Sequence, residues 1–467
     1  MERQNILDQQ RDKQATRRLY EDAARRAMNY RDAIDERRVG PLREGIEGLK
    51  RFDEPFPEFS TDPQEVISLL DEVGSPATMG MAGPRFFGFV IGASLPVTVA
   101  ANWIATGWNQ NTGLYTATPG TARLEEVCLR WMNELFGFPA STGCAFVTGA
   151  TMANFTALGA ARHHVLAQAG WDVEADGLFG APEITVVVGE EAHATLIKAL
   201  GLLGMGRNRT VVVPVDNQGR MRADKLPAIK APAIVCIQAG NVNTGSFDPA
   251  LEIIQHARAH GAWVHVDGAF GLWALASPKY EHLAKGLSDA DSWATDAHKW
   301  LNVPYDCGIA FVRQADQLRQ AMSLTAAYLP MTPQREPSQY TPELSRRARG
   351  VEVWAALRTL GRNGLAGMIE RGCSSAQRFA EGLQKAGHRI LNDVVLNQVL
   401  VSFGSPETTT RIITRIQEDG TCWCGGTVWQ EQTAMRISIS GWSTTADDVD
   451  RSLAVINRIA HEEKAGS

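Results

Sequence analysis

Two segments of the chain place a carboxylate and an amine at the ends of strand-like runs. Asp267 closes an apolar run that includes Val264 and Val266, and Lys299 follows in the segment 295–300. The carboxyl ends of buried strands are where open α/β sheets bind their ligands. A carboxylate buried there needs a cationic partner, and loss of hydration favours the neutral, nucleophilic form of a lysine. We therefore expect an ionised acid and a reactive amine to share one site.

This pair meets the minimum requirement of pyridoxal 5′-phosphate (PLP). A lysine attaches that cofactor as a Schiff base, and an aspartate keeps the pyridine nitrogen protonated so that the ring accepts the electron pair of a carbanion. Each residue alone has an ordinary alternative, because Asp267 could cap a helix and Lys299 could lie on the surface. The spacing of 32 residues between them favours the cofactor interpretation.

A loop of small residues provides a candidate phosphate site. Residues 148–154 follow the apolar run 145–147 and lead into an alanine-rich, helix-forming segment. Because backbone N–H groups at a helix N-terminus bind phosphate, this loop could hold a phosphate, with the hydroxyls of Thr148 and Thr151 as further donors. The loop lacks the glycine patterns of dinucleotide and P-loop sites, and similar junctions occur in many α/β proteins.

A histidine follows another expected strand. His193 comes shortly after the run 184–188. An imidazole at that edge can stack on a flat heteroaromatic ring and contact a substrate carboxylate. The alternative is an ordinary core or surface histidine.

Together these segments resemble the group II PLP-dependent decarboxylases, the family of aromatic-L-amino-acid and glutamate decarboxylases, within the fold-type I PLP enzymes. The resemblance runs from about Gly83 to about Trp442. Its matching segments are 84–89, 117–125, 148–154, 191–193, 240–248, 265–267 and 298–308.

The resemblance implies a role for each candidate residue. Lys299 would form the Schiff base, Asp267 would pair with the pyridinium and His193 would stack on the ring, while Ala150 and Thr151 would hold the phosphate. Further cofactor-binding candidates are Gly149, Asn241, Ala269, Thr295 and His298. We expect no metal site.

The resemblance also implies a catalytic loop. Tyr328 is similar to the family's mobile-loop tyrosine, which reaches into the partner subunit's site and protonates the substrate carbon after carbon dioxide leaves. Three departures bear on substrate and proton donor. Ala326 and Ala327 stand where aromatic decarboxylases usually have Asp-Pro, the stretch from Tyr328 to Arg346 is short, and Asn241 replaces a frequent threonine.

The expected substrate is an L-amino acid, bulky or aromatic, that is converted to an amine and carbon dioxide. The aromatic residues that suggest this preference are Phe86, Phe87, Trp103, Trp108 and Tyr115. The alternative is that most of them belong to the core. Arg346, in a segment similar to the family's arginine-rich helix entry, is a further substrate candidate.

Two other functions remain open. The same scaffold supports other PLP reactions, namely oxidative deamination to an aldehyde coupled to decarboxylation, and carbon–carbon bond formation of the aldol type. A non-catalytic protein with this fold is the third possibility, against which the intact Lys299 and Asp267 argue.

Composition agrees with an enzyme of this kind. The 467 residues are 44% hydrophobic and carry a net charge of −6 without a basic cluster, which argues against a nucleic-acid partner. No run of about 18 or more apolar residues predicts a membrane span, and the start lacks a secretory core, so we expect a cytoplasmic protein. The seven cysteines form neither a disulfide framework nor a zinc pattern.

The chain divides into three expected units. Residues 1–85 form a polar helical segment that, by the resemblance, lies across a partner subunit. Residues 86–340 alternate strand-like and helical runs, which predicts an α/β domain with a mostly parallel sheet covered by helices on both faces. Residues 341–467 predict a smaller α+β domain with strand-like runs at 394–401 and 435–439. The strands expected in the large domain are 145–147, 184–188, 211–215, 234–237, 263–266, 292–295 and 309–312. The resemblance implies that the large sheet has seven strands and that the active site of a homodimer lies at the subunit interface.

Overall fold

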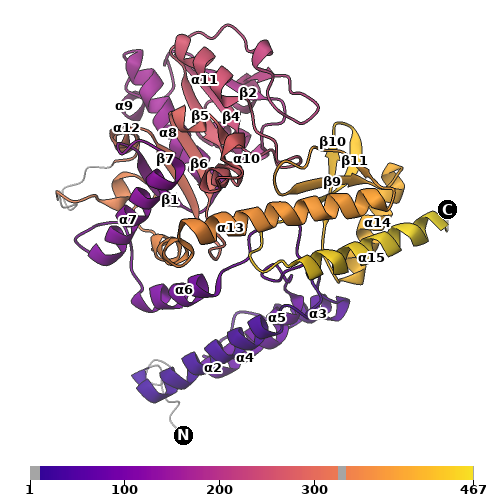
Figure 1. Cartoon of the computed structure of the whole chain (residues 1–467). Coiled ribbons are helices and arrows are strands. Elements are labelled where there is room, and N and C mark those ends of the chain that lie inside the picture. The colour runs from indigo at the N-terminus through magenta and orange to yellow at the C-terminus, as the bar shows by residue number, and fades with distance from the viewer. Residues whose placement is uncertain (1–10, 324–332, 466–467) are drawn as a thin grey trace.

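The chain folds around two β-sheets, with a group of N-terminal helices beside them (Figure 1). The structure is a computed structural model, and it describes residues 11–323 and 333–465. It confirms the expected fold class, which combines a seven-stranded mostly parallel sheet, a smaller sheet domain and a helical N-terminus.

The larger sheet has the strand order β1-β7-β6-β5-β4-β2-β3. Strands β2 to β6 run parallel to their neighbours within that group, and β7 is antiparallel to both β1 and β6. The strands are β1 (Gly143–Val147), β2 (Thr185–Gly189), β3 (Val211–Val213), β4 (Ala233–Gln238), β5 (Trp263–Asp267), β6 (Ser292–Asp296) and β7 (Gly308–Val312). All seven sequence-based strand predictions therefore coincide with observed strands, with ends shifted by one or two residues.

Both faces of this sheet are buried because successive side chains along a strand point to opposite sides. Val187, Val235 and Val264 belong to one apolar core, whereas Val186 and Ile234 belong to another. The first core is covered by α7 (Pro119–Phe136), α11 (Ala250–Ala259) and the start of α13 (Gly350–Lys385). The second core is covered by α8 (Ala150–Gln168), α10 (Ala194–Leu202) and α12 (Ala315–Met322).

The smaller sheet is antiparallel, in the order β10-β11-β9-β8. The expected strand at 394–401 begins only at Gln398, and the strand expected at 435–439 starts three residues earlier. Gln430 and Glu431, both with positive φ, form the two-residue turn between β10 and β11. The elements of this part are β8 (Arg389–Ile390), β9 (Gln398–Ser402), β10 (Gly425–Trp429), β11 (Gln432–Ser438), α14 (Pro406–Asp419) and α15 (Ala446–Ala465).

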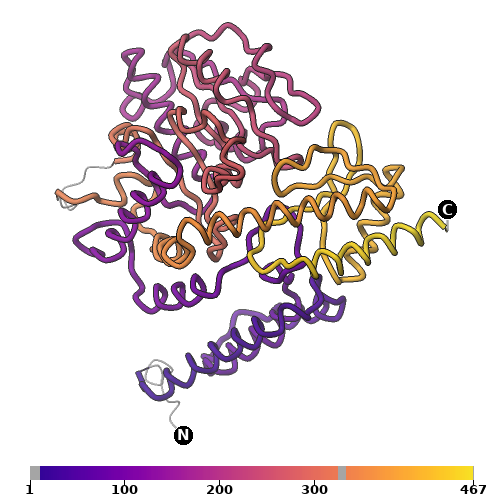
Figure 2. Tube along the Cα trace, in the orientation of Figure 1, coloured from indigo at the N-terminus to yellow at the C-terminus, as the bar shows by residue number. Residues whose placement is uncertain are grey.

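Helix α13 connects the two sheets. It bends at Gly361, whose φ is +56°, and then runs from the large-sheet part to the small-sheet part (Figure 2). Ile369 and Cys373 pack in the core of the large sheet, and Phe379 and Leu383 pack in that of the small sheet. Because α13 contributes side chains to both cores, it holds the two cores in position relative to each other.

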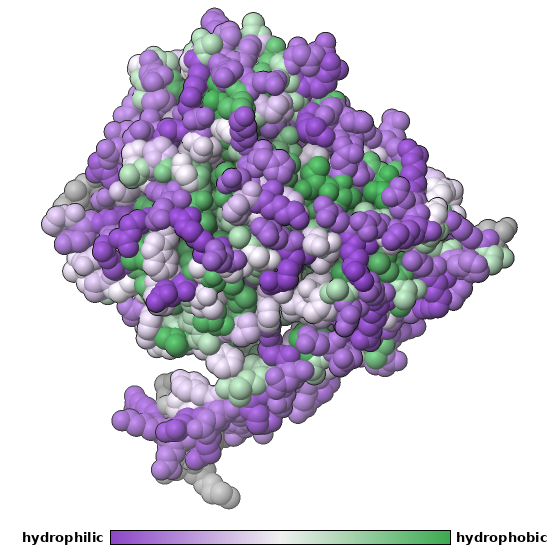
Figure 3. Space-filling view, viewed as in Figure 1, coloured by the Kyte–Doolittle hydropathy of each residue, from purple (hydrophilic) through white to green (hydrophobic). Residues whose placement is uncertain are grey.

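The N-terminal helices form an arm that extends from the body (Figure 1). None of the helices α2 to α5 buries a residue. The arm is largely hydrophilic on the face shown in Figure 3, and hydrophobic side chains are visible on the body next to it. Its helices and the following one are α2 (Lys13–Asp32), α3 (Arg43–Gly48), α4 (Pro63–Leu69), α5 (Ser75–Ala77) and α6 (Pro96–Trp108).

The remaining elements are short. They are α9 (Val173–Asp176), the π-turn η2 (Leu70–Gly74) and the 3₁₀ turns η1 (Leu49–Phe52), η3 (Arg207–Arg209), η4 (Ala223–Lys225), η5 (Gly271–Ala276), η6 (Glu281–Ala284), η7 (Leu287–Asp289) and η8 (Pro337–Gln339). In the described part of the chain, no helix is long and apolar enough to cross a membrane. All seven cysteines are buried and unpaired.

Candidate active site

A cavity of about 310 Å³ lies at the carboxyl ends of strands β4, β5 and β6. Gln238, Asp267 and Asp296 are the last residues of these strands and all line it. Eight of the residues proposed from the sequence also line this cavity: Gly149, Ala150, Thr151, His193, Asp267, Ala269, His298 and Lys299. The parallel sheet thus gathers residues that are up to 150 positions apart in sequence.

Lys299 lies in the turn after β6. Its Nζ is 2.9 Å from Oδ2 of Asp296, one helical turn earlier in sequence. Its backbone carbonyl accepts hydrogen bonds from the backbone N–H and the side-chain Nδ2 of Asn302. A side chain at Gly92 would collide with that carbonyl oxygen, so the chain passes close behind the lysine. The lysine backbone is therefore held from two sides while its amine faces the cavity.

Asp267 is a buried carboxylate with cationic and polar neighbours. Burial raises the pKa of this carboxyl group, and the nearby His193 and Lys299 act in the opposite direction. Its Oδ1 accepts a hydrogen bond of 3.3 Å from the backbone N–H of Ala269. Such a carboxylate can hold a proton on a cationic ring nitrogen, as a PLP site requires.

A series of hydrogen bonds between buried side chains leads to Asp267 and holds it in place. Trp263 Nε1 donates to Ser292 Oγ at 2.8 Å, and that hydroxyl is 2.9 Å from Nδ1 of His265. Nε2 of His265 is 2.8 Å from Oδ1 of Asn154, which is itself close enough to lower the pKa of Asp267. Burial lowers the pKa of His265 to about 3, so this imidazole is neutral, with its proton on the nitrogen that faces Asn154.

His193 is fixed as the N-cap of α10. Its Nδ1 accepts a hydrogen bond from the backbone N–H of Thr195 at 3.3 Å and is 2.7 Å from the hydroxyl of the same residue. Burial lowers the pKa of His193. Because Nδ1 accepts, the neutral ring carries its proton on Nε2.

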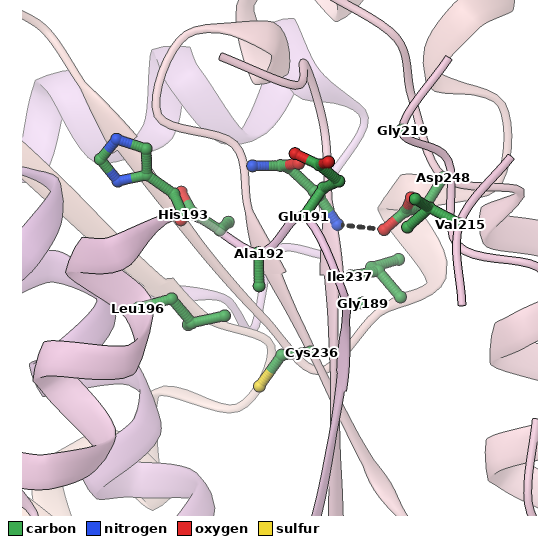
Figure 4. A pocket seen from close by; sticks show the side chains of 12 residues that line it. Gly189, Glu191, Ala192, His193, Leu196, Val215, Gly219, Cys236, Ile237 and Asp248 are labelled. Atoms are coloured by element: carbon green, nitrogen blue, oxygen red, sulfur yellow. Dashed lines mark hydrogen bonds between the residues drawn. The ribbon is translucent and has the colours of Figure 1, made fainter. Parts of the chain in front are cut away.

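A second buried carboxylate, that of Asp248, lines a small cavity together with Glu191 and His193. Asp248 accepts hydrogen bonds from the backbone N–H groups of Met221 and Gln238, both at 2.7 Å, and burial raises its pKa to about 6. Figure 4 shows Asp248 close to Glu191 and the His193 ring directed away from both. The cavity between them, about 10 Å³, has room for a single water molecule.

The N-terminus of α8 forms the candidate phosphate cradle. Gly149 precedes the helix without a side-chain cap, and the Ala150 N–H donates to Oδ1 of Asp296 at 2.6 Å. A side chain at Gly308 would collide with the Gly149 backbone, so β7 passes directly beneath this loop. The next N–H groups of α8 have no acceptor within the helix and are free to bind an anion.

His298 borders the cradle. Its Nδ1 accepts from the Cys307 backbone N–H at 3.0 Å, and its Nε2 is 3.4 Å from Oδ1 of Asp296. Its ring stacks on Tyr305, with centroids 4.2 Å apart. Amine, buried acid, imidazole and helix N-terminus thus fit PLP, with the carboxylate of Asp296 as an additional anion in the cradle.

Two cofactor candidates do not line the cavity. The Asn241 carboxamide oxygen accepts from the backbone N–H groups of Asn243 and Thr244, so this side chain shapes its own loop. Thr295 is fully buried within β6, where its hydroxyl donates to the carbonyl of Ala269. Strand alternation explains this position, because the neighbouring Asp296 faces the cavity instead.

The four substrate candidates also lie away from the cavity within this chain. Phe86 stacks on Trp423, and Phe87 packs in the core of the small sheet. The Tyr115 backbone N–H donates to Glu336, and Arg346 is buried in an ion pair of 2.7 Å with Glu125. Tyr328 lies outside the described residues.

Several cavity residues were missed by the sequence analysis. Arg436, from β11 of the small sheet, donates to Asn243 Oδ1 at 3.1 Å and to the carbonyl of Phe89 at 3.3 Å, and burial lowers its pKa. Phe89 and Val90 line the cavity with positive φ values of 60° and 158°. The alternation of β11 offered a weak signal for Arg436, but only the fold brings that strand to the large sheet.

Known proteins are similar to this chain in sequence and in fold. A family model described as "Pyridoxal-dependent decarboxylase conserved domain" matches residues 48–404. An aromatic-L-amino-acid decarboxylase of Bacillus atrophaeus is 25% identical over 457 residues, which cover 92% of this chain and 93% of that protein. An acidic amino acid decarboxylase of Bos taurus is 29% identical over 316 residues, which cover 65% of this chain and 60% of that protein.

Among solved structures, that of Oryza sativa TDC with PLP and tryptamine has the same fold. Its TM-score is 0.89 at 20% identity, and the match covers 97% of this chain and 98% of that one. The sequence and structure matches confirm the resemblance inferred from the sequence and the expected cofactor, PLP.

The buried His265 predicts a pH-dependent contribution to stability. Its pKa is about 3 in the folded chain and about 6.5 when unfolded, so the unfolded state takes up a proton first as the pH falls. This contribution is complete above pH 6.5 and is lost towards pH 3. In His265→Gln, we expect the slope of unfolding free energy against pH to fall by up to about 1.4 kcal/mol per pH unit between pH 6 and 4. Urea unfolding at several pH values measures this slope.

The control is His260→Gln, because His260 is exposed whereas His265 is buried. We expect this variant to have the same slope of unfolding free energy against pH as the parent chain. Equal slopes in the parent and in His265→Gln would contradict the assignment of a buried neutral imidazole.

Proposed function

This chain belongs to the pyridoxal-dependent decarboxylase family, and we propose that it converts a bulky or aromatic L-amino acid to the corresponding amine and carbon dioxide. The observation that carries the proposal is the shared cavity of Lys299, Asp267 and His193 at the carboxyl ends of the sheet strands. The family establishes a PLP-dependent carboxy-lyase acting on an amino acid, and its members differ in the amino acid that they use.

The residues of the chain divide the work. PLP, when bound, supplies an electron sink for the pair left on the substrate carbon as carbon dioxide departs. Lys299 would hold the cofactor through its Nζ, which faces the cavity. Asp267, kept in place by the Ala269 N–H and, through Asn154, by His265, would hold a proton on the ring nitrogen.

His193 supplies a neutral imidazole that can stack on a ring and donate one hydrogen bond. Its Nδ1 is engaged by Thr195, so the N–H of Nε2 can donate to a substrate carboxylate, while the face of the imidazole can stack on a ring. Phe89 and Phe270 contribute apolar walls to the cavity. A carboxylate placed against such walls is less well solvated than in water, which favours its loss as neutral carbon dioxide.

Replacing the attachment residue tests the reaction class. We expect Lys299→Ala to lose covalent cofactor attachment and to reduce carbon dioxide release from every amino acid by at least about 10³-fold. Borohydride reduction with peptide mapping, together with release of carbon dioxide and analysis of amine and aldehyde products, measures both. A label on another lysine, or aldehyde as the main product of the unaltered chain, would overturn the assignment.

Arg436 supports a second candidate substrate class. Its partly buried guanidinium faces the same cavity, where it could pair with the side-chain carboxylate of an acidic amino acid. The alternative role, which agrees with the proposed aromatic preference, is to hold the Phe89 carbonyl and Asn243.

A comparison of phenylalanine, tyrosine, tryptophan, aspartate and glutamate separates these roles. We expect an aromatic substrate to have the highest kcat/KM and to lose less than about tenfold in Arg436→Gln, because no ion pair to the substrate is removed. If aspartate or glutamate is preferred and loses more than about tenfold in the variant, the acidic class is correct.

We further propose that the chain acts as a homodimer with its active site at the subunit interface. The N-terminal arm exposes many large apolar side chains, and α6 exposes Trp103, Ile104 and Trp108. Helices that bury none of their residues within one chain need another surface to cover their apolar sides.

A charge on α6 tests this assembly. We expect Ile104→Lys to shift the mass from twice 50.9 kDa towards 50.9 kDa and to lower activity, because a lysine would be buried in the interface. Light scattering measures the mass. Val428→Lys, at an exposed position of β10 away from the arm, is the matched control. An active monomer would contradict the proposal.

A further inference from the structure

The carboxylate of Asp296 lies in the cradle formed by the N-terminus of α8. Its Oδ1 accepts the Ala150 N–H at 2.6 Å, and its Oδ2 is 2.9 Å from Nζ of Lys299. Its side chain is only 3% exposed, and His298 Nε2 is 3.4 Å away. The Ala150 N–H, the Lys299 amine and the His298 imidazole could each bind an anion from outside, and all three already face the carboxylate of Asp296.

The position is an anion site for reasons independent of Asp296. Helix α8 has 19 residues, and Gly149 before it offers no side-chain cap. A Cβ at Gly149 would lie only 3.3 Å from Cε1 of His298, so the absence of a side chain here lets this imidazole lie close to the start of α8. The first N–H groups and the helix dipole favour negative charge at this end.

We propose that Asp296 is an internal anion that occupies the phosphate-binding site of the unloaded chain and is displaced from the Ala150 N–H when PLP binds. The proposal rests on PLP binding, and not on which amino acid is the substrate. A phosphate that takes the same N–H groups would meet a carboxylate at close range, and like charges at such distances oppose each other.

Asp296 therefore sets the affinity for phosphate-bearing ligands. It lowers that affinity by competing for the cradle, and it compensates the Lys299 charge before the cofactor arrives.

The test compares two probes that carry no aldehyde and so cannot react with Lys299. Pyridoxamine 5′-phosphate and pyridoxamine are titrated into the cofactor-free chain by calorimetry. In Asp296→Asn, which keeps an acceptor for the Ala150 N–H, we expect the phosphate-bearing probe to bind at least about tenfold more tightly, because the like charge is gone. Pyridoxamine should change by less than about threefold, because it carries no phosphate.

Two further variants complete the design. Asp296→Ser removes the charge with a smaller side chain and should give the same shift, which guards against a local folding defect of either variant. Asp306→Asn, in the same connection but paired with Arg349 at 3.0 Å, should leave both probes unchanged. Unchanged or weaker binding of pyridoxamine 5′-phosphate in both Asp296 variants would overturn the proposal. Because no turnover is measured, the result does not depend on the proposed decarboxylation.

Discussion

Buried charge at one edge of the large sheet is the constraint on which the rest of this structure depends. Asp267 and Asp296 end adjacent strands and are almost cut off from water. A charge in such surroundings is stable only with partners at fixed positions. Lys299 faces both carboxylates, and backbone N–H groups from α8 and from the turn after β5 complete their contacts.

That requirement explains the close packing of backbone around the site. Gly308 passes beneath Gly149, and Gly92 passes behind Lys299, at distances that leave no room for a Cβ atom. Asn302, in the left-handed region, ties the lysine carbonyl to the small-sheet part through Ser440. The reactive amine is thus carried by a backbone with little freedom, which keeps it facing the cavity.

The cavity also depends on the smaller sheet. Arg436 reaches it from β11 and holds the carbonyl of Phe89, a residue with positive φ. Phe89 in turn stacks on Trp423 of the small-sheet part. The lining of the cavity therefore comes from both sheets, and movement of one sheet against the other would change the shape of the cavity.

The sequence by itself determined the strands of the large sheet, because their apolar runs alternate with helical patterns of sufficient length. It also singled out the proposed pair Lys299 and Asp267 by residue type, spacing and position after a strand, and both line one cavity in the fold. It could not determine which side chains of a strand or loop face the cavity. Thr295 and Asp296 are neighbours, yet only the register of β6 decided that the aspartate lies in the cradle. Phe86 and Phe87 lie close in sequence to Phe89, which lines the cavity, but in the fold they contact the small-sheet part instead. Arg436, more than a hundred residues from Lys299, entered the site only through tertiary packing, because contacts between distant segments leave no local pattern in the chain.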